Sequence, residues 1–186
     1  MLYVQQSLSA DENIVYVGRF HWFYDVQAAM AIFWGFFFAV TLLASVETLV
    51  ETLPANIAGL LLSSPLEADD GWFAIIRKIH PFIKLLALLI FLLGVFRFAQ
   101  MMVIKMTTEI VVTSSRLIYK RGLVARSVGE MNIDRIESVS VWQPFWGRIF
   151  NFGRLIIRGM GVGEMVMPNL ADPIVFRKAI EHARNH

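Results

Sequence analysis

The sequence contains no cysteine among its 186 residues. Disulfide bonds, thiolate zinc sites, iron–sulfur clusters, a cysteine nucleophile and a lipid-modified bacterial cysteine are therefore excluded. Charged residues are scarce, at 17%, whereas hydrophobic residues make up 56% and the mean hydropathy is +0.57. This chain is too apolar for an ordinary soluble domain of its size. The composition therefore indicates a membrane protein.

Two long stretches of the sequence are strongly apolar and contain few or no charged residues. Residues 26–46 carry no charged side chain, and residues 81–104 form a second apolar run that includes Lys84 and Arg97. Each run is long enough, at helical rise, to cross a hydrocarbon layer of about 30 Å, which needs about 20 residues. The sequence thus predicts two transmembrane helices at these positions.

Small residues and one charge within the spans are candidates for helix packing. Ala31, Gly35 and Ala39 recur at four-residue spacing, which would allow another helix to approach the backbone closely. Chance composition is an equal alternative for so loose a pattern. Arg97 is the one unambiguous charge inside the second span, and its long side chain can reach the headgroups near Lys105. We favour this interpretation of Arg97 over a functional one.

The distribution of charge predicts the orientation. Residues 1–25 have neither the basic start nor the early apolar run of a cleavable signal peptide. The loop at 47–80 contains five acidic residues and no basic residue before position 77, whereas the region 105–186 has twelve Lys or Arg against seven Asp or Glu. The positive-inside rule then places both termini in the cytoplasm, although three basic residues at 77, 78 and 84 argue for the opposite orientation.

From residue 105 onward the pattern changes to short strands separated by turns. Strands are predicted at 108–113, 116–121, 123–128, 135–142, 154–158 and 164–167. Such closely spaced strands indicate an antiparallel barrel or sandwich. Imperfect alternation near Glu137 and Ser138 predicts a β-bulge, and Pro168 is expected to end the last strand. Asp172 and Pro173 then predict the start of an amphipathic C-terminal helix.

Four motifs of this region resemble those of a known family. They are TSSRLIYKRGL at 113–123, NIDRIESVSVWQ at 132–143, GRLIIRG at 153–159 and DPIVFR at 172–177. In this order they are similar to bacterial pleckstrin-homology-like domains of the membrane-anchored bPH2 or YdbS-like type. The resemblance implies a bacterial inner-membrane protein of class membrane α plus β. In it, two transmembrane helices precede a small PH-like antiparallel β-barrel with a C-terminal helix, at 105–186.

No motif of the sequence points to catalysis. His182 and His186 lie at helical spacing but have no third metal ligand nearby in the sequence. The adjacent carboxylates of Asp11 and Glu12 have no evident base or metal partner. The resembled family is not one with established active-site residues. We therefore expect a protein that is not an enzyme, with no catalytic, cofactor-binding or metal-binding residue.

Two groups of residues are candidates for recognition. The first is a basic set flanking the first hairpin of the C-terminal region, where Lys or Arg near an anionic leaflet contribute about 1 kcal/mol each. A solvated strand face is an equal alternative. The second is an aromatic turn with more rings than a small core can bury, and exposed apolar patches mark lipid or protein contacts. The candidates for lipid or partner contact are Arg116, Lys120, Arg121, Arg126, Phe145, Trp146, Arg148 and Phe150.

The sequence therefore predicts a membrane-anchored interaction module that binds a partner protein, sister subunits or anionic lipid headgroups. The alternative is a small accessory subunit of a larger membrane enzyme or transport complex, in which the helices make the main contacts. Nucleic acid is not expected as a partner, because the basic region has no known reading element. A PH-like fold by itself does not identify the ligand.

Overall fold

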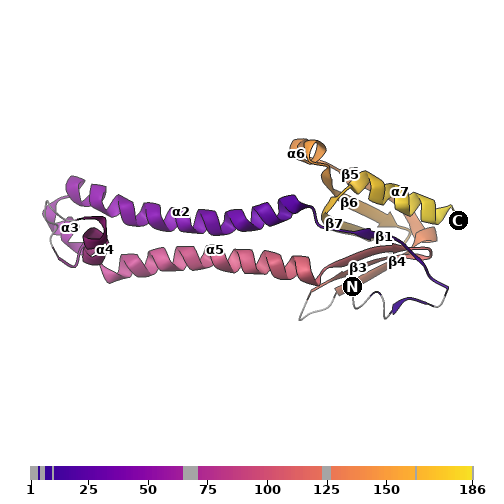
Figure 1. Cartoon of the computed structure of the whole chain (residues 1–186), viewed down its shortest axis with the longest axis horizontal. Coiled ribbons are helices and arrows are strands. Elements are labelled where there is room, and N and C mark those ends of the chain that lie inside the picture. The colour runs from indigo at the N-terminus through magenta and orange to yellow at the C-terminus, as the bar shows by residue number, and fades with distance from the viewer. Residues whose placement is uncertain are drawn as a thin grey trace. The chain divides into compact units, whose positions relative to one another are not determined.

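The computed structural model describes residues 4, 7–9, 11–64, 71–122, 127–161 and 163–185. The chain divides into two compact units. Figure 1 shows the whole chain, coloured by residue number. The β unit combines Met1–Val26 with Met102–His186, and the helical unit comprises Gln27–Met101. The N-terminal segment therefore folds with the C-terminal region, although the two apolar runs lie between them in the sequence.

Long apolar helices dominate the helical unit. They are α2 (Trp22–Thr52) and α5 (Pro81–Thr107), of which residues 22–26 and 102–107 are grouped with the β unit. The short helices α3 (Ala55–Leu61) and α4 (Trp72–Lys78) lie between them in sequence. By length and composition, α2 and α5 are each able to cross a membrane. Only 17% and 11% of their most apolar windows are buried, so most of the apolar side chains there face outward.

Two antiparallel sheets form the β unit. Sheet A has the order β1 (Ile14–Gly18), β2 (Glu109–Thr113), β3 (Arg116–Arg121) and β4 (Ser127–Asn132). Sheet B consists of β5 (Ile136–Trp142), β6 (Phe152–Gly159) and β7 (Gly163–Ala171). Strand β1, which precedes both apolar helices, pairs with β2, which follows them. The fold of the β unit thus depends on both ends of the chain.

The sheets do not close into the barrel that the family resemblance implied, and that expectation is wrong. The 3₁₀ turn Ile133–Arg135 carries the chain from β4 to β5, so these consecutive strands belong to different sheets. In the described part of the β unit, the segment that follows β1 meets strand β7 through one isolated bridge, between Phe20 and Leu170. The fold is therefore an open two-sheet sandwich.

The main core lies between the sheets and beneath the C-terminal helix α7 (Pro173–Arg184). Helix α7 begins as predicted, with Asp172 at the N-cap and Pro173 at the first position, and it buries Phe176 and Ile180. Sheet A is also covered on its outer face, where Val4 packs against Val111 and Ile118. Because both of its faces are covered, β2 is apolar at successive positions and does not alternate.

Two register shifts are found in the described strands of sheet B. The predicted bulge at Glu137 is confirmed, because the β5–β6 register shifts between Ile136 and Ser138. The prediction that Pro168 ends the last strand is wrong, since β7 continues to Ala171. Its register with β6 slips between Arg154 and Ile156, which leaves Pro168 at a bulge, where a proline is tolerated.

Candidate functional site

Glu12 is a buried carboxylate that holds Arg116 against sheet A. Only 3% of its side chain is exposed, and it accepts hydrogen bonds from Arg116 at 2.8 and 3.0 Å. The hydroxyls of Thr113 and Ser115 donate to the same carboxylate. These bonds, above all those from Arg116, lower the pKa of Glu12 to about 2. Arg116 also pairs with Glu130 at 2.9 Å, so its guanidinium is engaged within the β unit.

Lys120 is also engaged within the β unit. Its ammonium lies 3.1 Å from the carboxylate of Glu109, and both side chains are largely buried. Burial acts to raise the pKa of Glu109, but hydrogen bonds from Lys120 and from the backbone N–H of Val4 outweigh it, and the pKa is lowered. Arg126 lies outside the described residues. Of the predicted basic set, Arg121 is therefore the described member that is not held in an ion pair of sheet A.

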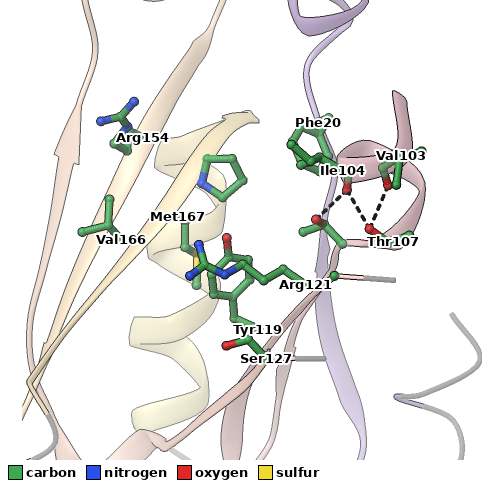
Figure 2. A pocket seen from close by; sticks show the side chains of 13 residues that line it. Phe20, Val103, Ile104, Thr107, Tyr119, Arg121, Ser127, Arg154, Val166 and Met167 are labelled. Carbon is green, nitrogen blue, oxygen red and sulfur yellow. Dashed lines mark hydrogen bonds between the residues drawn. The ribbon is translucent and has the colours of Figure 1, made fainter. Parts of the chain in front are cut away.

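Arg121 lines a pocket of about 650 Å³ in the β unit (Figure 2). The walls come from the end of β3, the start of β4, strands β6 and β7, Phe20 and the last turns of α5. Arg154 of β6 is the second basic residue of the lining, and the described lining contains no Asp or Glu. At Gly122 the backbone turns out of β3 with φ +94°, a conformation that favours glycine.

The wall that α5 contributes to this pocket is apolar. Val103 and Ile104 expose close to half of their surface. The hydroxyl of Thr107 donates to the carbonyl of Val103 at 2.8 Å, and the hydroxyl of Thr108 donates to the carbonyl of Ile104 at 2.7 Å. Both hydroxyl protons are therefore used in bonds to carbonyls of α5. The pocket lining therefore combines two arginine residues with an apolar wall.

Helix α6 (Phe145–Ile149) presents aromatic side chains to the outside between β5 and β6. Phe145 is 72% and Trp146 58% exposed, and Arg148 is exposed on the same helix. Gly147 faces inward, where a Cβ would meet the carbonyl oxygen of Phe152 at 2.5 Å. This close approach fixes α6 on β6 and leaves its aromatic side chains without cover from the described residues.

These rings continue onto the start of α2. Phe150 contacts Trp22 edge-on, with ring centroids 5.6 Å apart, and stacks on Trp146 at 6.1 Å. Phe23 stacks on Phe152 at 4.9 Å. We call Phe145, Trp146 and Phe150 the α6 aromatic patch. It adjoins Trp22, the first residue of α2.

An ion pair joins the ends of the two long helices within the β unit. The ammonium of Lys105 lies 2.5 and 2.7 Å from the two carboxylate oxygens of Asp25. Asp25 is in the first turn of α2 and Lys105 in the last turn of α5, where each charge also interacts favourably with its own helix dipole. The pair therefore holds these two helix ends together.

In the helical unit, α2 and α5 meet at small residues. A Cβ on Gly94 would lie 2.6 Å from the carbonyl oxygen of Ala31, and one on Gly35 would lie 2.9 Å from the Cα of Gly94. Ala39 is buried as well. The small-residue face of α2 therefore packs on α5 of the same chain. Arg97 is exposed and donates to the side chain of Gln100, one turn further along α5, at 3.0 Å.

Comparison with known families agrees with this architecture. The sequence profile of the bacterial PH domain family, bPH_2, matches residues 22–184, which include both long helices, all strands from β2 to β7 and α7. The chain belongs to the bacterial PH domain family. Searches of curated proteins and of solved structures found no match. Membership of the bacterial PH domain family supports an interaction module, because PH-like domains are generally non-catalytic.

The sequence interpretation of this bacterial PH domain protein missed three features of the candidate site. The sequence assigns no partner to Glu12, because Arg116 lies 104 residues further along the chain. Arg154 and Phe20 were not singled out, since their meeting with Arg121 depends on how three separate segments pack. Among the described residues no group of three His, Asp or Glu gathers as a metal site.

Proposed function

We propose that this protein is a non-enzymatic interaction module of the bacterial cytoplasmic membrane. Helices α2 and α5 span the bilayer, both termini are cytoplasmic, and the β unit rests on the cytoplasmic leaflet while it presents its remaining surface to a protein partner or a sister copy. The observation that carries this proposal is the contact between the α6 aromatic patch and Trp22, at the start of α2.

The chemistry of the patch matches the lipid–water boundary. If α2 spans the bilayer, the ring of Trp22 lies where the helix enters it, and side chains that touch Trp22 lie at a similar depth. Trp and Phe rings favour this interfacial layer, and a cation such as Arg148 can reach lipid phosphates from there. In water the same exposed rings would be a costly apolar surface. The patch is therefore suited to dock the β unit on the leaflet.

The depth of the patch can be measured in the full-length protein. Because the natural chain has no cysteine, Trp146→Cys gives a single attachment site for a fluorophore. In phosphatidylcholine nanodiscs we expect lipids spin-labelled at the headgroup to quench this fluorophore strongly. Val175→Cys, at an exposed apolar position of α7, is the matched control and should respond to a water-soluble quencher. If position 146 is as accessible to the water-soluble quencher as position 175, the docked arrangement is wrong.

An accessory-subunit role has one observation in its favour. The helical unit carries an apolar groove of about 430 Å³ lined by side chains such as Phe36, Leu43, Ile76 and Leu88, and the helix of another membrane protein would fit such a surface. Mass measurement after purification in mild detergent separates the two functions. A stable complex with other membrane proteins would favour the accessory subunit, whereas a monomer or homo-oligomer favours the module.

A further inference from the structure

We propose that the pocket lined by Arg121 and Arg154 binds the phosphate of a single anionic glycerophospholipid. The lipid phosphate would lie between the two guanidinium groups, and its glyceride part would lie against Val103 and Ile104. This site is separate from the α6 aromatic patch, but it rests on the proposed function, because a lipid can enter the pocket only if the β unit lies at the bilayer surface.

The first argument is unbalanced charge. Arg121 and Arg154 make no ion pair with any residue that the structure describes, and no carboxylate lies in the described lining of their pocket. Arg116 and Arg158, by contrast, each face a glutamate. Two arginines that line one pocket without an ion-pair partner among the described residues attract an anion, and the planar fork of N–H donors on each guanidinium matches phosphate oxygens.

The second argument is that Arg121 and Arg154 belong to strands of different sheets. Figure 2 shows Arg121 reaching from the end of β3 toward Met167, whereas Arg154 stands on the side of the pocket nearer Val166. Because they belong to different sheets, the two arginines are placed by the sandwich and not by sequence proximity. The open seam between the sheets is therefore what makes room for a ligand between them.

The third argument distinguishes a lipid from a soluble phosphate. Val103 and Ile104 form part of the pocket wall and belong to the last turns of α5, the helix that we propose leaves the bilayer here. An inorganic phosphate gains nothing from an apolar wall, whereas the glycerol esters and first acyl carbons of a phospholipid would cover it. A volume of about 650 Å³ is also larger than a phosphate group alone requires.

The test uses the full-length protein in micelles that contain phosphatidylglycerol and phosphatidylcholine of equal chain length, with bound lipid counted by native mass spectrometry. We expect one phosphatidylglycerol to be retained in preference to phosphatidylcholine. The double variant Arg121→Gln/Arg154→Gln should reduce this retention by at least about tenfold, the size of one lost charge-assisted hydrogen bond. Arg158→Gln removes the same charge from the same strand outside the pocket and should leave retention unchanged.

Three results would overturn the proposal. Equal retention by the wild type and the double variant would show that the pocket does not bind the lipid. An equal loss in Arg158→Gln would show that diffuse positive charge, and not the pocket, attracts it. Displacement by an equimolar amount of soluble glycerol phosphate would assign the pocket to a free anion. The quenching test of the α6 aromatic patch is done without anionic lipid, so its outcome does not depend on the pocket. The quenching test can therefore fail while the phosphatidylglycerol preference holds, and the preference can be absent while the quenching test succeeds.

Matching circular dichroism spectra confirm that the double variant is folded before its lipid retention is compared. Both arginines are exposed at the pocket, so glutamine at these positions leaves the core untouched.

Discussion

Glu12 connects the segment before the first apolar helix to the sheet that follows the second. Its carboxylate accepts bonds from Arg116, Thr113 and Ser115, all in or next to the β2–β3 hairpin. A carboxylate that is buried and fully hydrogen-bonded costs little, but a buried arginine that loses its partner is costly. A single acidic side chain therefore helps to hold β1 against β2 and, at the same time, occupies Arg116.

The stability of the β unit should depend on pH through Glu12. Its pKa in the folded protein, about 2, lies below the ordinary value of 4.5, so its contribution is complete above pH 4.5 and is lost as the pH falls toward 2. Such a shift corresponds to a contribution on the order of 3 kcal/mol. Near-ultraviolet circular dichroism melts of the full-length protein in detergent, taken across this range, would measure the loss.

Glu12→Gln should lower stability at neutral pH by about 2 kcal/mol and flatten the dependence between pH 4.5 and 2. Asp11→Asn is the matched control, because Asp11 is the exposed neighbour of Glu12. A Glu12→Gln variant that keeps the acid transition of the wild type would show that another carboxylate controls it.

At the level of elements, the contact between α2 and α5 depends on two glycines. Gly35 and Gly94 face each other so closely that a side chain on either would meet backbone atoms of the other helix. Unlike side-chain atoms, these backbone atoms cannot rotate away. Small residues at such a crossing allow the van der Waals contacts that hold helices together where lipid surrounds them.

Gly94→Leu should separate the two helices and lower the thermal stability of the helical unit. Overpacking of this kind costs about 1–3 kcal/mol. Gly59→Leu, in α3, is the control, because no atom lies within 4 Å of the added Cβ at that position. Thermal unfolding in detergent, followed by far-ultraviolet circular dichroism, would compare the variants. Equal melting of the two variants would mean that the glycine contact contributes nothing.

For the whole molecule, the helical unit is an insertion into the β unit. Strand β1 ends before α2 and strand β2 begins after α5, yet the two strands pair. A fragment that starts at Thr107 lacks β1 and Glu12, so the edge of β2 would lie open and Arg116 would lose its main partner. Experiments on the β unit therefore need the complete chain.

The proposed orientation can be tested in cells with single cysteines. Glu51→Cys, at the far end of α2, should react with a membrane-impermeant thiol reagent added from outside, whereas Asn185→Cys, after α7, should react only after the membrane is permeabilised. Both positions are exposed. The reverse pattern would place the β unit outside the cytoplasm and would agree with the basic residues at 77, 78 and 84 that oppose the positive-inside assignment.

The sequence by itself determined the features that depend on neighbouring residues. The apolar runs predicted α2 and α5, the period-two segments predicted most of the strands, and Asp172 with Pro173 predicted the start of α7. Even the bulge at Glu137 was visible as a break in alternation. Each of these signals lies within a few residues, because helical and strand periodicities are local properties of the backbone.

Only the tertiary structure decided which distant residues meet. In it, β1 pairs with β2 although the helical unit lies between them in the sequence, and Glu12 forms an ion pair with Arg116. It also places Arg121 and Arg154 in the lining of one pocket. It also left the sandwich open, because among the described residues β7 pairs with the segment after β1 through one isolated bridge at Phe20. Such contacts depend on the packing of segments up to about a hundred residues apart, and no local pattern encodes them.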